Sequence, residues 1–198
     1  MIFAKKNKSF TIMAKRINRI AIFIDHDNFV TSFKHRHKLD KINLEQWEQL
    51  NDNLINAYKK IFPFKEEVDH IGTWICLPRS RYPQAKGELN FLESMDGVDC
   101  LQKFIVKYGF WKSSRGGKEE KMVDTEIVCQ MLVGAFRDEY DTCFILSDDA
   151  DYVPAINRIQ DDYGKRVIQV GFMDRTFIRA ACFGHLPLEK SDRNLNIK

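Results

Sequence analysis

The feature that most constrains this chain is a short run of apolar residues, 20–24, that stops abruptly at Asp25. A strand with one face in water alternates apolar and polar residues, whereas a strand covered on both faces is apolar throughout. A second run of this kind, residues 142–146, ends at Ser147 and two aspartates. The pattern therefore predicts a sheet with helices on both of its faces.

Stretches with helical spacing lie between such runs. Apolar residues recur every three or four positions in three segments, which predicts helices over residues 43–62, 123–136 and 152–163. Shorter helices are expected at 87–95 and 175–182, further strands at 68–77, 98–110 and 166–170, and a polar loop at 113–120. Gly164 follows a predicted helix, where a left-handed residue is favoured. Alternating strands and helices predict an α/β fold, a three-layer α/β/α domain with a mostly parallel central sheet.

The positive charge of the chain is concentrated at its N-terminal end. Net charge is +3, but the first 19 residues hold six basic and no acidic residues, which leaves 25 basic against 28 acidic in the rest. Residues 20–198 therefore lack the broadly basic composition of a domain that binds nucleic acid through bulk charge. We expect a disordered basic extension over 1–18, a folded domain over 19–186 and a polar tail over 187–198.

Cysteine usage and hydropathy bear on location. The five cysteines are far apart and form no Cys-x-x-Cys pair, which indicates a reducing compartment and argues against a zinc site. The sequence has no run of about 18 apolar residues, and its N-terminal segment lacks the apolar core of a secretion signal. We therefore expect a cytoplasmic protein without a membrane partner. The sequence is compatible with a homo-oligomer.

Aspartates follow both of the apolar runs. Asp25 ends the first, and Asp149 and Asp151 follow the second. Ligands of parallel sheets bind beyond the carboxyl ends of the strands, so we expect these side chains at one edge. Asp124, at the start of the helix 123–136, is a further candidate. Carboxylates gathered in one place repel one another unless a cation joins them, and an all-oxygen set favours Mg²⁺ or Mn²⁺.

Four segments resemble motifs of the NYN domain family, a branch of the PIN-like ribonucleases. Residues 22–29, IFIDHDNF, are similar to the apolar strand, Asp and Asn that open this domain. Residues 121–124, KMVD, resemble its Lys-x-x-Asp at a helix start, and residues 145–154, ILSDDADYVP, resemble Ser-Gly-Asp-Ser-Asp-Phe-x-Pro. The glycine and strand at 164–168 are similar to the segment that follows. The resemblance covers residues 19–186.

This resemblance implies a PIN-like fold and metal-dependent cleavage of RNA that leaves 5′-phosphate and 3′-hydroxyl ends. Matched to the motifs, the catalytic and metal-binding residues are Asp25, Asp124, Asp149 and Asp151. Asn28 is the polar residue beside them. The implied cofactor is Mg²⁺ or Mn²⁺, and the implied partner is RNA, single-stranded or structured.

Three positions depart from the family pattern. His26 and Asp148 stand where the motifs have glycine, and Cys182 stands where a late helix often has a further aspartate. An extra carboxylate at Asp148 is expected to change the affinity for metal or to block the approach of a phosphate. The missing late acid would weaken the acidic cluster.

Basic residues near the same edge are candidates for binding the RNA backbone. Arg79 and Arg81 follow a predicted strand, and Lys121 opens the Lys-x-x-Asp segment. Arginines interleaved with an aromatic residue, here Tyr82, suit a single strand of RNA whose bases stack. We predict that Arg79, Arg81 and Lys121 bind the substrate together with Asn28.

Two other functions are compatible with the sequence. An apolar strand that ends in Asp-x-Asp also resembles phosphatases of the haloacid dehalogenase type, in which Asp25 would be a covalent nucleophile. The same fold could also bind RNA or a protein without cleaving. The sequence favours a metal-dependent endoribonuclease, because the segments KMVD and SDDADYVP fit the phosphatases less well.

Overall fold

The computed structural model describes residues 16–37, 42, 44–62, 66–79, 104–114, 117–172 and 176–188. The strands in these residues are β1 (Ile17–Asp25), β2 (Glu67–Arg79), β3 (Phe104–Ser114), β4 (Gly117–Lys121), β5 (Thr142–Leu146), β6 (Arg166–Gly171) and β7 (Gly184–Pro187). The helices are α1 (His26–His37), α2 (Leu44–Ile61), α4 (Val123–Phe136), α5 (Val153–Asp161) and α6 (Phe177–Ala181), with a 3₁₀ turn, η1 (Ala150–Tyr152).

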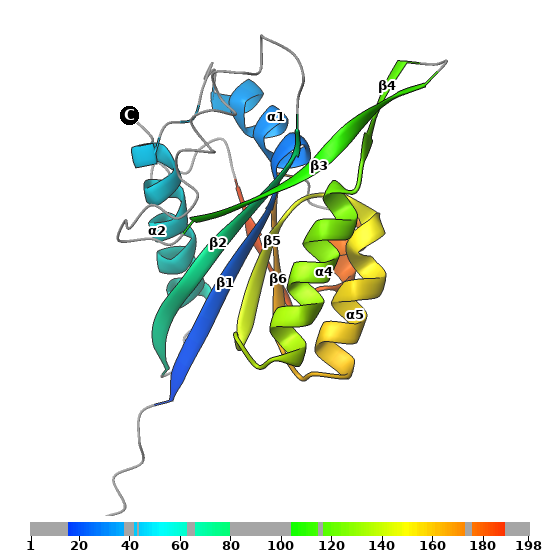
Figure 1. Cartoon of the computed structure of the whole chain (residues 1–198). Helices are drawn as coiled ribbons and strands as arrows, with labels where there is room; N and C mark the ends of the chain where they lie inside the picture. The colour runs from blue at the N-terminus through cyan, green and yellow to red at the C-terminus, as the bar shows by residue number, and fades with distance from the viewer. Residues whose placement is uncertain are drawn as a thin grey trace, which may run out of the picture.

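The described strands form one seven-stranded sheet in the order β4-β3-β2-β1-β5-β6-β7. Neighbouring strands are parallel except for the antiparallel pair of β3 and β4. Helices α1 and α2 lie on one face and α4 and α5 on the other (Figure 1), so the predicted α/β/α fold is confirmed. The strand order reverses between β1 and β5, and open α/β sheets bind ligands beyond the strand ends at such a point.

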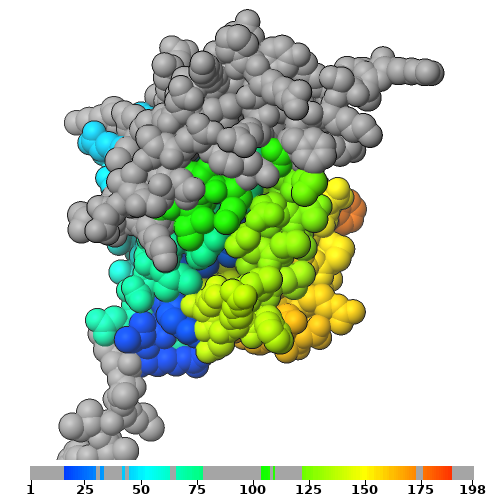
Figure 2. Space-filling model, viewed as in Figure 1, coloured from blue at the N-terminus to red at the C-terminus, as the bar shows by residue number. Residues whose placement is uncertain are grey.

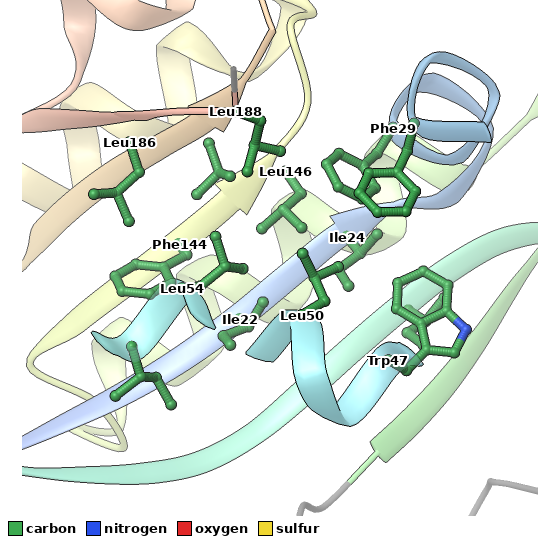
Figure 3. Packing of buried hydrophobic residues seen from close by; sticks show 14 of the residues in the cluster. Ile22, Ile24, Phe29, Trp47, Leu50, Leu54, Phe144, Leu146, Leu186 and Leu188 are labelled. Carbon is green, nitrogen blue, oxygen red and sulfur yellow. The ribbon is translucent and has the colours of Figure 1, made fainter. Parts of the chain in front are cut away.

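Alternate side chains of β1 enter two different apolar clusters. Ile22 and Ile24 pack in the same cluster as Trp47 and Leu50 on the α2 side (Figure 3). Phe23 points the opposite way, into the cluster under α4 and α5. Figure 2 shows these two helices side by side on the surface of that face. Both faces of the strand are therefore buried over residues 20–24, which explains why this run is apolar without a break.

Several predicted elements have the bounds that the structure gives them. The helix 123–136 and the strand 142–146 agree residue for residue, and the helix 43–62 differs by one residue at each end. Gly164 has a φ of 63°, the predicted left-handed conformation. The helix predicted at 152–163 is shorter, because Tyr152 belongs to the 3₁₀ turn η1 and α5 ends at Asp161. The helix predicted at 87–95 lies outside the described residues.

Other predictions about elements are wrong. The polar loop expected at 113–120 contains the end of β3 and most of β4, which pair antiparallel at the edge of the sheet. Lysine and glutamate suit an exposed edge strand, so their polarity concealed it. The first strand starts at Ile17, before the apolar run, and α1 and β7 were not predicted. Helix α1 is rich in polar residues and β7 has only four residues, so neither shows a clear apolar period.

A buried polar network closes the opposite end of the sheet. The Thr142 hydroxyl donates to Oδ1 of Asn18 at 3.0 Å, and the Asn18 amide donates to the Tyr58 hydroxyl at 3.2 Å. Arg166 donates to Oγ1 of Thr142 at 3.0 Å and to Glu66 at 2.8 Å. The network joins β1, α2, β5 and β6, and such mutually satisfied buried groups favour a single register.

We predict that Gly164→Ala lowers the free energy of unfolding by about 1 kcal/mol, because a Cβ disfavours the left-handed conformation. An added Cβ would meet nothing within 4 Å, so backbone strain alone acts there. Urea unfolding measures the effect. Gly164→Asn is the matched control and should lose less, since asparagine tolerates this conformation. Equal losses in the two variants would contradict the explanation.

Candidate active site

The acidic site lies where β1 and β5 end side by side. Ile24 of β1 pairs with Leu146 of β5, so the next residues, Asp25 and Ser147, occupy neighbouring positions. The two-residue period of a strand turns both side chains away from the α1 and α2 face, toward α4. The Ser147 hydroxyl donates a hydrogen bond to Oδ2 of Asp25 at 3.2 Å.

Asp25 is a buried carboxylate with donors from three segments. It is only 5% exposed. Besides Ser147, the backbone N–H of Asn28 donates to its Oδ1 at 3.2 Å, and the Tyr152 hydroxyl donates to its Oδ2 at 3.0 Å. The bond from Asn28 is the one that a capping aspartate makes at a helix start, so Asp25 also caps α1. This capping role explains why a helix begins directly after the strand.

Tyr152 joins Asp25 to a second carboxylate. The same hydroxyl lies 2.9 Å from Oδ1 of Asp124, an exposed residue in the first turn of α4. The Tyr152 side chain is itself fully buried. A phenol has one proton, so it donates to one of the two carboxylates at a time. When Asp25 and Asp124 are both ionised, only one of their two contacts with the Tyr152 hydroxyl contains a proton. The pair of carboxylates could therefore accommodate a further positive charge.

Burial and, to a smaller extent, the negative charge of Asp124 raise the pKa of the Asp25 carboxyl to about 6. The hydrogen bonds from Asn28, Tyr152 and Ser147 lower the pKa of Asp25 but do not offset its burial. Burial also raises the pKa of the Tyr152 hydroxyl, which therefore stays protonated as a donor. Asp25 is therefore a poorly solvated carboxylate whose ionised form is disfavoured.

The other two predicted carboxylates lie on the turn after β5. Oδ1 of Asp149 accepts from the Asp151 backbone N–H at 3.0 Å, so Asp149 caps η1. The Asp149 N–H in turn donates to Oγ of Ser147 at 3.1 Å, which connects the turn to Asp25. Asp151 is exposed. Among the residues that the structure describes, no three His, Cys, Asp or Glu side chains gather closely enough to hold a metal by themselves.

Asp148 and Asn28 support the site from the other side. The Asn28 side-chain oxygen accepts from the Asp148 N–H at 3.1 Å, which ties the start of α1 to the turn after β5. Oδ1 of Asp148 accepts from the amide of the buried Gln169 at 2.8 Å, and this amide also donates to the Ser147 carbonyl at 3.1 Å. A Cβ on Gly171 would lie 2.3 Å from Oδ1 of Asp148, so the carboxylate packs closely against β6.

The other departures from the motifs are also placed. The ring nitrogen Nδ1 of His26 lies 2.9 Å from Asp27, and the His26 side chain is buried. Cys182 is half-buried against the α4 and α5 cluster, and burial raises the pKa of its thiol to about 12. Cys182 is therefore a packing residue rather than a reactive thiol.

The predicted substrate-binding residues are only partly described. Arg79 ends β2 and Lys121 ends β4, and both backbones pair with Phe110 of β3. The two positions thus share one cross-strand row, roughly 10 Å apart at the usual strand spacing. Asp25 pairs with Cys76 in β2, so Arg79 lies three residues farther along the same edge. Arg81 lies outside the described residues.

Comparison with known proteins adds the family. The sequence profile of the NYN domain matches residues 19–188. The chain belongs to the NYN domain family. NYN domains are PIN-like nucleases that act on RNA and typically use divalent metals, so membership supports a nuclease.

The other comparisons add the fold alone. A crystal structure of a protein of unknown function from Vibrio parahaemolyticus is similar to this NYN domain, with a TM-score of 0.59 and 18% identity. The alignment covers 90% of this chain and 97% of that one. A search of curated proteins finds no match. Of the helices described for this NYN domain, none is long and apolar enough to cross a membrane.

Sequence reasoning missed three residues that hold this site together: Ser147, Tyr152 and Gln169. Ser147 and Tyr152 lie inside the segment that resembles the family motif, whose pattern points to its aspartates. Tyr152 stands where that motif has phenylalanine, and a polar residue at an apolar position is a signal that could have found it. Gln169 carries the same signal, as an amide within a predicted buried strand.

We predict that Asp25→Asn stabilises the metal-free protein at neutral pH. The pKa of Asp25 in the folded protein, about 6, exceeds its ordinary value of 3.8, so the native state favours the protonated carboxyl. That contribution is fully present below pH 3.8 and is lost as pH rises to about 6. Ionised Asp25 therefore costs about 3 kcal/mol near pH 7, a cost that asparagine avoids.

Urea unfolding in EDTA at about pH 8 and about pH 4 measures this effect. Asp25→Asn should raise the free energy of unfolding at the higher pH and change it little at the lower one. Asp162→Asn is the control, because this exposed aspartate follows α5 and forms an ion pair with Arg158. A loss of stability in Asp25→Asn at about pH 8 that is absent at about pH 4 would show that the ionised carboxylate is favoured instead.

Proposed function

We propose that this chain is a metal-dependent endoribonuclease that hydrolyses phosphodiester bonds of RNA. The observation that carries the proposal is the convergence of Asp25 and Asp124 on the Tyr152 hydroxyl, at the strand-order reversal of an NYN domain. Two carboxylates around one hydroxyl proton form an oxygen-only set short of positive charge, which fits Mg²⁺ or Mn²⁺. Magnesium is commonly held by one or two carboxylates together with water and phosphate.

In this proposal Asp25 and Asp124 hold the ion, and Asp149 and Asp151 add negative charge from the turn after β5. The bound ion would lower the pKa of a coordinated water and neutralise charge on the phosphoryl oxygens. Ser147 and Asn28 keep Asp25 in place through the bonds described above. Asp149 keeps the turn in shape by capping η1.

Attack by water is favoured over attack by a protein nucleophile. Asp25 is 5% exposed, and both of its oxygens already accept hydrogen bonds. A phosphatase of the haloacid dehalogenase type would need this carboxylate free to reach phosphorus. The Ser147 hydroxyl is likewise engaged, since it donates to Asp25 and accepts from the Asp149 N–H.

Substrate binding is proposed along the edge that continues from Asp25 toward β4. Arg79 and Lys121 share one row of this edge, and Arg81 follows in the chain. Cations there would bring the RNA backbone to an otherwise acidic site. We place the protein in the cytoplasm, in line with the free state of the four described cysteines.

We predict that Asp149→Asn abolishes RNA cleavage while keeping the fold. Asparagine retains the oxygen that caps η1, so only the charge is removed. Asp149→Ala removes charge and cap together and should also lose about 1 kcal/mol of stability. A gel assay on single-stranded and structured RNA, with Mn²⁺ or EDTA, measures cleavage and the product ends. Full activity of Asp149→Asn would contradict this role, and binding without metal-dependent cleavage by the unaltered protein would favour a non-catalytic module.

We also predict that Mn²⁺ raises the melting temperature more than Mg²⁺ does with the same ligands. An ion that binds only the native state adds about 2.7 kcal/mol to the free energy of unfolding when its concentration is one hundred times its Kd. Asp25→Lys should abolish the shift, since it reverses the charge at the centre of the site. The control Asp162→Asn should keep it. If millimolar Mn²⁺ leaves the unaltered protein unchanged, the proposed site is wrong.

A further inference from the structure

We propose that Tyr152 is a positioning residue whose hydroxyl holds Asp25 and Asp124 together, so that the pair is arranged before a cation binds. The proposal rests on the proposed function, because it names the residue that prepares the metal site. Tyr152 stands where the family motif quoted above has phenylalanine.

The hydroxyl is fixed by the packing of its ring. Tyr152 is fully buried in the cluster under α4 and α5, together with Ile156 and Ile178. It also ends η1, whose start is capped by Asp149, and α5 begins at the next residue. A side chain held in this way cannot turn its hydroxyl aside without repacking the cluster. The oxygen is therefore a fixed point between the two carboxylates.

Asp25 and Asp124 depend on the Tyr152 hydroxyl for their position to different degrees. Asp25 is also held by Asn28 and Ser147. For Asp124, which is exposed, the hydrogen-bond partner recorded among the described residues is Tyr152. Like charges repel, so without the hydroxyl the Asp124 side chain would swing toward solvent. Loss of the hydroxyl should therefore release Asp124 and leave Asp25 in place.

A hydroxyl at this position supports a cation rather than competing with it. Each carboxylate oxygen accepts more than one bond, and Oδ1 of Asp124 uses only part of its capacity on Tyr152. Hydrogen bonds to ligating carboxylates orient them, and removal of such outer partners typically weakens metal binding by about 10–100-fold. We therefore expect removal of the Tyr152 hydroxyl to weaken cation binding.

The test compares Tyr152→Phe with Tyr140→Phe in metal-free, full-length protein. Tyr140 is the matched control, because it is buried in the same cluster and donates a hydrogen bond to the Met131 carbonyl at 2.7 Å. Both variants lose one buried hydroxyl. Calorimetric titration with Mn²⁺ should give roughly tenfold weaker binding for Tyr152→Phe and unchanged binding for Tyr140→Phe.

The outcomes separate the two proposals. If the unaltered protein binds no Mn²⁺, the proposed function fails. If it binds and Tyr152→Phe binds equally well, only the role of Tyr152 is wrong. Tighter binding by Tyr152→Phe would also overturn that role, since the hydroxyl would then be a competitor.

A spectroscopic measurement keeps the proposal testable if Tyr152→Phe does not fold. In fluorotyrosine-labelled protein, Mg²⁺ should move one fluorine resonance, because the carboxylates on either side of Tyr152 gain a partner. The resonance that disappears in Tyr140→Phe should be a different one. If Mg²⁺ binds but every tyrosine resonance stays in place, Tyr152 does not touch the site in solution.

Discussion

Asp25 is a carboxylate at the end of a strand whose last six residues are buried, and the protein around it has to supply the donors that water would otherwise give. Those donors come from the first turn of α1, from the residue after β5 and from η1. One side chain thereby fixes how three separate segments meet. The donors do not fully offset the burial, as the raised pKa of Asp25 shows. The contacts that assemble the site therefore do not supply enough positive charge to balance its carboxylates.

Asp148 supports the turn after β5 through contacts with β6. The sequence places an extra carboxylate at this turn, and its Oδ1 accepts from Gln169 and lies against Gly171. A glycine in its place would offer no such bond. The turn after β5 is therefore held on two sides, by Ser147 toward Asp25 and by Asp148 toward β6. A rigid turn is what allows Tyr152 to present its hydroxyl at a fixed position.

The sequence predicted the layers, most strands and the edge at which the aspartates lie, because apolar runs and helical spacing report burial directly. It did not predict α1, whose start is capped by Asp25 and whose described buried apolar residues, Phe29 and Phe33, stand among many polar ones. It also treated the four aspartates alike, although Asp25 is buried, Asp124 is exposed and Asp149 is a cap. The role of Tyr152 was not predicted for a related reason. Its partners Asp25 and Asp124 lie 127 and 28 positions away in the chain, and contacts over such separations leave no local pattern in the sequence.

The neutral network of Asn18, Tyr58 and Thr142 lies at the amino ends of the strands whose carboxyl ends hold the aspartates. Along β5 the two ends are roughly 16 Å apart, too far for direct contact. The register of β1 and β5 is thus fixed at the end of the sheet opposite the proposed active site. During divergence such a sheet can lose or exchange acidic side chains at one end while the other keeps the strands in order. One ancestral scaffold can in this way give rise to descendants that cut nucleic acid and to others that only hold it.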